Sequence, residues 1–162
     1  MTQLDIEIKN DNRQVEGWLL WYHERKREYL NTREAIIHSS GPTLHEVVRG
    51  NETNISDPTG RKGEKLAELK RTEEWLRLIE EVEARLPWKL EIFLRLRRDY
   101  RYARGRNGWV AGVQWKFAEE VAKQLDKKPS ETWVESRSTF WSWWNQIVDY
   151  TARLAAKRGL LE

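Results

Sequence analysis

Apolar residues recur every three or four positions over most of this chain, which is the spacing of one face of an α-helix. The first such segment covers about residues 12–39, and its apolar positions are Val15, Trp18, Leu19, Tyr22, Tyr29, Ile36 and Ile37. Gly41 and Pro42 follow, and both residue types favour a helix end. The pattern therefore predicts one long amphipathic helix. Alternation with a period of two is confined to a short LDIEI at positions 4–8, so no sheet is predicted.

The helical spacing resumes after an irregular connector at 41–57, which is rich in Gly, Asn, Thr and Ser. This connector is longer than a compact bundle needs, so we expect it to be either functional or flexible. Ser56 or Asp57 followed by Pro58 is typical of a helix start. A second helix is predicted from about Asp57 to Leu86, where Pro87 ends or kinks it.

Three more helices are predicted beyond Pro87. Their expected ranges are Trp88 to Tyr100, about Trp109 to Leu125, and a last helix that ends near Lys157. The segments RYARGRNG and DKKPSE between them indicate turns. Two starts of the last helix stay open: one at the Ser136 cap, and one near Ser130 that would place Trp133 and Val134 inside the helix.

These elements predict an all-α protein with long N-terminal helices and a C-terminal helical bundle. We expect two parts, namely residues 1–55 with the first helix and a flexible connector, and residues 56–162 as a helical domain. The segment WKFAEEVAKQL, a turn and SRSTFWSWWNQIV have the order of a helix-turn-helix at about 110–157. The connection is longer than the usual three or four residues.

The last helix carries an aromatic run with only Ser142 interrupting it between Phe140 and Trp144. Phe140, Trp144 and Ile147 share one face at helical spacing, so these rings are predicted to build the core. The opposite face is small and polar, and it consists of Ser138, Ser142, Asn145 and Asp149. Trp141 borders that polar face near the helix start, which makes it a candidate for contact with a ligand.

Charge is distributed unevenly along the chain. Residues 1–84 hold 13 Lys/Arg against 17 Asp/Glu, whereas residues 85–162 hold 16 against 9, so their net charges are −4 and +7. Such asymmetry favours a polyanionic partner, most often nucleic acid, at the C-terminal half. An unevenly charged, solvated surface is the alternative. The chain has no Cys, no apolar run of membrane-spanning length and no signal-peptide pattern, so we expect a cytoplasmic protein without a membrane partner.

Candidate DNA contacts follow from side-chain chemistry. Arg suits guanine and Asn suits adenine in the major groove, and cationic side chains neutralise phosphates. An arginine-rich stretch between Leu94 and Gly108 has a net charge of +5, with Asp99 as its single acidic residue. The expected DNA-binding residues are Arg137, Ser138, Trp141, Ser142, Asn145, Arg98, Arg101, Arg104, Arg106, Lys127 and Lys128. The alternative for each is a solvated helix face or helix end.

No constellation typical of an enzyme is present. His23, His38 and His45 lie in the N-terminal half without Cys or a metal-binding spacing, and neither a phosphate-binding loop nor a G-x-S-x-G motif occurs. We therefore predict no catalytic residues, no metal and no cofactor.

Four segments together resemble the RinA/ArpU-type family of phage late-operon transcriptional regulators. They read YHERKREYLNTREAIIHSS, SDPTGRKGEKLAEL, EWLRLIEEVEARLPWKLEIFLRLRRDY and TFWSWWNQIVDYTARLAAKRGL, in that order. The family's C-terminal part is similar to the DNA-binding region of sigma-like factors and ends in a helix-turn-helix. The resemblance implies that Arg137, Ser138, Ser142 and Asn145 face the groove. It also implies a bacterial host cell as the setting.

Three functions are consistent with the sequence. The first is a phage or prophage transcriptional regulator that binds double-stranded DNA, with its long N-terminal helices serving homo-oligomerisation or contact with RNA polymerase or a phage protein. The second is a DNA-packaging component of the small-terminase type, which would form a ring. The third is a helical protein-interaction adaptor whose basic half meets an acidic partner.

Overall fold

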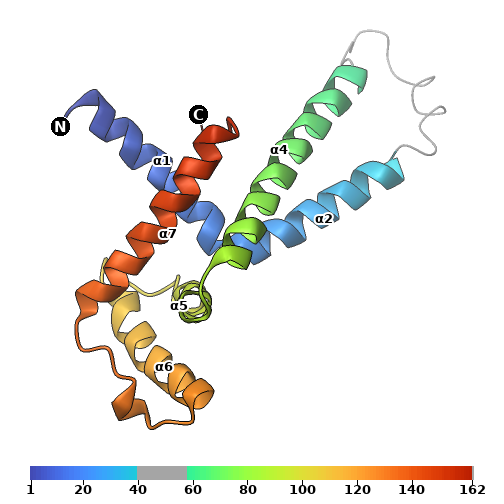
Figure 1. Cartoon of the computed structure of the whole chain (residues 1–162). Coiled ribbons are helices and arrows are strands. Elements are labelled where there is room, and N and C mark those ends of the chain that lie inside the picture. Colours follow the sequence, from blue (N-terminus) through green and yellow to red (C-terminus); the bar gives the residue numbers. More distant parts are fainter. Residues whose placement is uncertain (40–57, 162) are drawn as a thin grey trace.

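The computed structural model describes residues 1–39 and 58–161, and this part of the chain is helical without a strand. Its elements are α1 (Gln3–Leu20), α2 (Tyr22–Ser39), α4 (Pro58–Arg85), α5 (Trp88–Asp99), α6 (Gly108–Leu125), the 3₁₀ helix η1 (Pro129–Glu131) and α7 (Arg137–Lys157) (Figure 1). The prediction of an all-α fold is confirmed. The connector at 41–57 and the helix cap at Ser56 or Asp57 lie outside the described residues.

The N-terminal helix differs from its prediction in two ways. It begins at Gln3 rather than near residue 12, because Thr2 and Asp5 form a reciprocal cap in which the Asp5 N–H donates to Thr2 Oγ1 (3.2 Å) and the Thr2 N–H to Asp5 Oδ2 (2.9 Å). It also ends at Leu20, since Trp21 has φ −105° and ψ 21° and breaks the helical run. Arg98 Nε donates to the Leu19 carbonyl oxygen at 2.7 Å and thereby satisfies an acceptor at the bend.

The bounds of α4, α5 and α6 lie within one residue of those predicted. The structure also decides between the two predicted starts of the last helix. Helix α7 begins at Arg137 after Ser136. The alternative start near Ser130 is wrong, because Trp133 and Val134 lie in the connection between η1 and α7. Helices α6 and α7 pack against each other. The helix-turn-helix assignment of this pair stays a prediction.

Aromatic rings pack among aliphatic side chains in the buried core, and rings of the aromatic run are among them, which confirms the interpretation of that run. Phe140 and Trp144 are fully buried, and the Phe93 ring lies with its centre 6.0 Å from that of Phe140. The Trp144 indole N–H donates to Glu16 Oε1 at 3.2 Å and so links α7 to α1. At the far side of the core, Trp18 stacks on Trp75 with ring centres 5.2 Å apart. Large rings therefore add substantially to the apolar burial that the aliphatic side chains provide.

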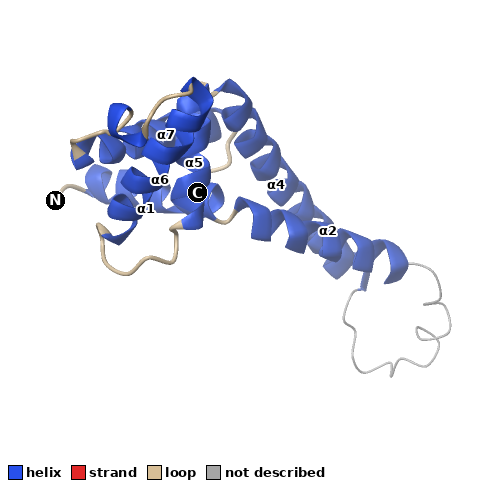
Figure 2. Cartoon of the chain, turned by 90° about the horizontal axis from the view of Figure 1, so that it is seen from below, coloured by secondary structure: helices blue, strands red, loops and turns tan. Residues whose placement is uncertain are grey.

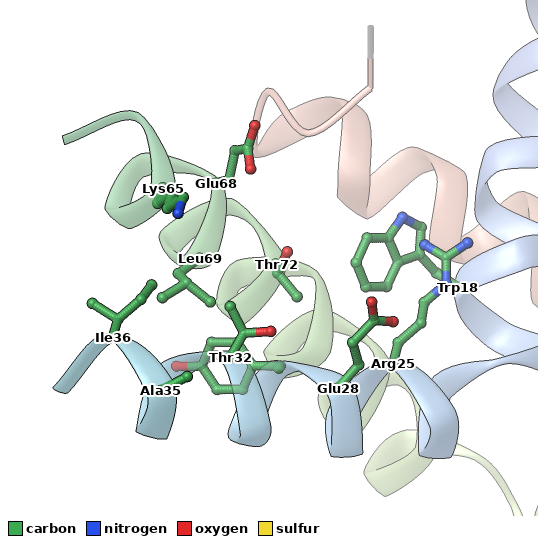
Figure 3. Close-up of a pocket in the computed structure, with 11 residues that line it drawn as sticks. Trp18, Arg25, Glu28, Thr32, Ala35, Ile36, Lys65, Glu68, Leu69 and Thr72 are labelled. Carbon is green, nitrogen blue, oxygen red and sulfur yellow. The ribbon is translucent and has the colours of Figure 1, made fainter. Parts of the chain in front are cut away.

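Helices α1, α5, α6 and α7 form the body of the protein, and α2 extends from it beside the first part of α4 as an arm (Figures 1 and 2). A groove of about 820 Å³ runs between the two helices of the arm. Trp18 and Arg25 lie at its inner end, whereas Ile36 and Lys65 lie towards the tip (Figure 3). The basic C-terminal elements are thus on the body, and the aromatic core extends through Trp18 to the inner end of the groove.

Candidate nucleic-acid interface

One buried side chain anchors the first turn of α7 to α6. Gln114 is 4% exposed, and its Nε2 donates to the carbonyl oxygens of Val134 (2.7 Å) and Glu135 (3.3 Å). Its Oε1 accepts a hydrogen bond from Arg137 Nε at 3.2 Å. A buried amide is costly unless it is bonded, and these three bonds use both of its donor hydrogens and its acceptor oxygen. They hold the approach to α7 and one exposed arginine relative to α6.

A strip of small polar side chains covers the outer face of α7. Ser138, Ser142 and Asn145 are exposed on this strip, while Phe140 and Trp144 on the other face are buried. Ser138 shares a hydrogen bond of 2.7 Å with Ser136 through their hydroxyls. The predicted division into a core face and a polar face is therefore confirmed, and it leaves the predicted groove-facing residues accessible.

The turn before α6 lies against the start of α7. The Trp141 indole N–H donates to Asn107 Oδ1 at 3.0 Å, and its ring meets the buried Trp109 ring edge-on with centres 5.0 Å apart. The guanidinium carbon of Arg106 lies 5.7 Å from the centre of the Trp141 ring. Arg104 is exposed in the same turn. Tertiary packing thus places Arg106 next to Trp141, which borders the polar strip of α7.

Two arginines expected at the interface are engaged elsewhere. Arg98 is 6% exposed, forms an ion pair with Glu83 and bonds to the Leu19 carbonyl oxygen. The predicted phosphate contact does not fit Arg98, because a buried guanidinium with these partners has no face left for a phosphate. Arg101 is mostly covered and forms an ion pair with Glu24. Both side chains hold α5 to the bend between α1 and α2.

Arg97 supplies a partly buried cation that the sequence did not reveal. Its guanidinium carbon lies 4.3 Å from the centre of the Trp109 ring and 4.8 Å from that of Trp144. Burial lowers the pKa of Arg97 to about 10, and the nearby charge of Glu16 opposes this effect. The group is still protonated at neutral pH, and its stacking on two rings offsets part of the cost of its desolvation.

The two lysines of the DKKPSE turn lie apart from the other candidate residues. Lys127 and Lys128 are exposed, and they follow α6 at Asp126, which takes a left-handed conformation with φ 52°. The Lys128 N–H donates to Glu131 Oε2 at 2.9 Å and fixes η1 beside this turn. Helix α6 separates these lysines from Arg106 by its whole length, about 25 Å at 1.5 Å per residue. Any contact that they make with DNA would be a separate one.

An exposed aromatic pair, one ring from α6 and one from the connection between η1 and α7, was not predicted. Trp115 and Trp133 are 61% and 41% exposed, and their ring centres lie 5.8 Å apart in an edge-to-face arrangement. With Ala118 and Pro129 they line a shallow pocket of about 480 Å³.

In the part of the chain that the structure describes, no three His, Asp or Glu side chains are grouped to hold a metal ion, and no helix is both long and apolar enough to cross a membrane. Comparison with protein-family models, with curated proteins and with solved structures found no match.

Proposed function

We propose that this protein is a DNA-binding transcriptional regulator of phage or prophage origin. In this proposal α7 enters a major groove through Ser138, Ser142 and Asn145, and the arginines of the turn before α6 contact flanking phosphates. The observation that supports it best is the placement of Arg106 beside Trp141, one helical turn from Arg137. Cations and groove-sized polar side chains then share one surface.

Arg104, Arg106 and Arg137 have no carboxylate partner among the described residues, which favours a phosphate partner. Several other exposed arginines of the body are paired with carboxylates, as in Arg153 with Asp149 and Arg95 with Glu120. Among the described residues, Arg104, Arg106 and Arg137 form no ion pair of this kind. Unpaired cations on one surface attract a polyanion, and each neutralised phosphate releases a counterion and steepens the salt dependence of binding by about 0.9 in log K against log salt.

The polar strip has the chemistry of direct base readout. A helix fits the major groove, where Asn bonds adenine through two contacts and Ser bonds several base edges. Replacing Asn145 by Ala should therefore relax sequence preference and cost about 1–3 kcal/mol at a cognate base pair. If the Asn145→Ala variant discriminated between duplexes as the wild type does, Asn145 would not be one of the residues that contact the bases.

The proposal is tested by separating the two kinds of contact. The double variant Arg104→Ala/Arg106→Ala should weaken binding to all duplexes alike and lower the salt slope by about 2. Lys157→Ala is the matched control, because this exposed lysine lies at the other end of α7, about 30 Å from Arg137. It should leave affinity and slope nearly unchanged.

Two results would count against the regulator. If the double variant and the control changed affinity and salt slope equally, the phosphate contacts would have to lie on another surface. Binding that is salt-sensitive but without sequence preference, together with a ring-sized oligomer in solution, would favour a packaging component instead.

A further inference from the structure

We infer that Gln114 is a positioning residue that presents the two terminal nitrogens of Arg137 to a guanine in the major groove. The inference rests on the proposed function and adds to it one base pair and the residue that controls its readout. It assigns a role to a buried amide that the core itself does not require.

The position of Gln114 is that of a core residue. It lies on the buried face of α6 between Val113 and Phe117, and it is itself almost completely buried. An apolar side chain of similar length would fill this position without polar atoms to satisfy. The amide of Gln114 instead forms three hydrogen bonds, all to the approach and the first residue of α7.

The three hydrogen bonds of Gln114 have two different effects. The two donated by Nε2 end on the Val134 and Glu135 carbonyl oxygens and hold the backbone that leads into α7. The third joins Oε1 to Arg137 Nε at 3.2 Å and acts on a side chain that is otherwise exposed. It limits the orientations of a long, flexible side chain before any ligand arrives.

Because Gln114 binds Nε of Arg137, the other nitrogens of the guanidinium remain available for DNA. A guanidinium carries five N–H donors in a planar fork, and Nε has only one of them. With Nε–H committed to Gln114, the two terminal nitrogens Nη1 and Nη2 stay available as an end-on pair. That pair matches the O6 and N7 acceptors of guanine, which is the commonest specific arginine contact in the major groove. Ordering the fork in advance lowers the conformational entropy lost on binding.

The test begins with a duplex selected by the wild-type protein from a random pool, in which each guanine is then replaced singly by 7-deazaguanine. This base lacks the N7 acceptor and keeps Watson–Crick pairing. At one guanine wild type should lose about tenfold or more in affinity. Arg137→Met should abolish that loss, because methionine keeps an unbranched apolar side chain and has no hydrogen-bond donor for N7.

Two variants of Gln114 separate positioning from support. Gln114→Met loses all three bonds, whereas Gln114→Glu keeps an acceptor for Arg137 Nε and loses both donations to the carbonyls. Both should lower the melting temperature. Gln114→Glu should retain the discrimination against 7-deazaguanine. Gln114→Met should lose most of it, and adding Arg137→Met to Gln114→Met should have no further effect on it. Equal discrimination in the Met and Glu variants would show a supporting role only and overturn the inference.

A measurement on wild type covers the case in which the Gln114 variants do not fold. In an NMR spectrum of the free protein, the Arg137 Nε–H should exchange slowly with water and should remain bonded in the DNA complex. Rapid exchange in either state overturns the inference and leaves the proposed function standing. Failure of wild type to select or bind any duplex overturns both.

Discussion

Replacing Gly112 by alanine should destabilise this protein, although alanine is normally the better residue in a helix interior. A Cβ atom at position 112 would lie 2.2 Å from Tyr100 Cε1 and 2.6 Å from Tyr100 Cζ. Carbon atoms in contact are normally about 3.5–4.0 Å apart, so the ring must move or α5 and α6 must separate. Tyr100 ends α5 and precedes the turn with Arg104 and Arg106, so the same shift reaches the proposed interface.

The expected size of the effect follows from two opposing terms. Alanine gains about 0.5–1 kcal/mol over glycine within a helix. Overpacking a filled site costs about 1–3 kcal/mol. Because the added Cβ would lie as close as 2.2 Å to Tyr100, the upper half of that cost, about 2–3 kcal/mol, applies, and the net loss should be about 1–2.5 kcal/mol. For a protein of this size 1 kcal/mol corresponds to about 2–4 °C in melting temperature. Thermal unfolding followed by circular dichroism should therefore show a fall of about 2–10 °C.

Gly63 supplies the matched control, since it is a helical glycine of α4 whose added Cβ would meet nothing within 4 Å. Gly63→Ala should raise the free energy of unfolding by about 0.5–1 kcal/mol. In a Tyr100→Ala background, Gly112→Ala should also become stabilising, because the clashing ring is gone. If Gly112→Ala alone raised the melting temperature as Gly63→Ala does, the close packing of α5 on α6 would be refuted.

Two further predictions concern the charged groups that hold the helices together. Arg98→Met should lower the free energy of unfolding by about 2–3 kcal/mol in denaturant titrations, because Glu83 loses its partner and the Leu19 carbonyl oxygen loses its donor. An unchanged denaturation midpoint would mean that the ion pair contributes nothing. Glu80→Gln should destabilise at pH 7 and approach wild-type stability towards pH 3, because the Tyr22 hydroxyl lowers the pKa of Glu80 from its ordinary 4.5. A carboxylate whose pKa is lower in the folded than in the unfolded protein stabilises the folded state at pH values above its unfolded pKa. This contribution is lost as the pH falls through the folded pKa. A difference between the two proteins that is constant from pH 7 to pH 3 would contradict this reasoning.

Helices α4 to α7 could be predicted from the sequence because their signals are local. The spacing of apolar residues set their faces, and Pro58, Pro87 and Gly159 stand at or near their ends. The break at Trp21 could not be predicted in this way. Val15, Leu19 and Tyr22 keep helical spacing across it, so the pattern continues where the helix stops. What changes there is tertiary, namely the hydrogen bond from Arg98 to the Leu19 carbonyl oxygen.

The candidate site was predictable only in part, for a related reason. Counting charges placed Arg98 and Arg106 in one basic cluster, but the two point to different environments. Arg98 stands four residues after the buried Leu94, so the two share a helix face, and this spacing indicates burial of Arg98 despite its charge. Gln114 carried a similar signal as a polar residue next to Val113 on an apolar stripe. The pairing of Arg106 with Trp141 joins segments 35 residues apart and has no local signal.

DNA binding by this protein is best tested by titrating the wild type with duplex DNA at about 50 and 200 mM salt, with random-sequence competitor present. We expect binding that weakens steeply with salt and still prefers a selected sequence over the competitor, since phosphate contacts set the slope and the polar strip of α7 sets the preference. The absence of binding even at the lower salt concentration would contradict it. In that case the exposed arginines beside α7 would serve a partner other than DNA.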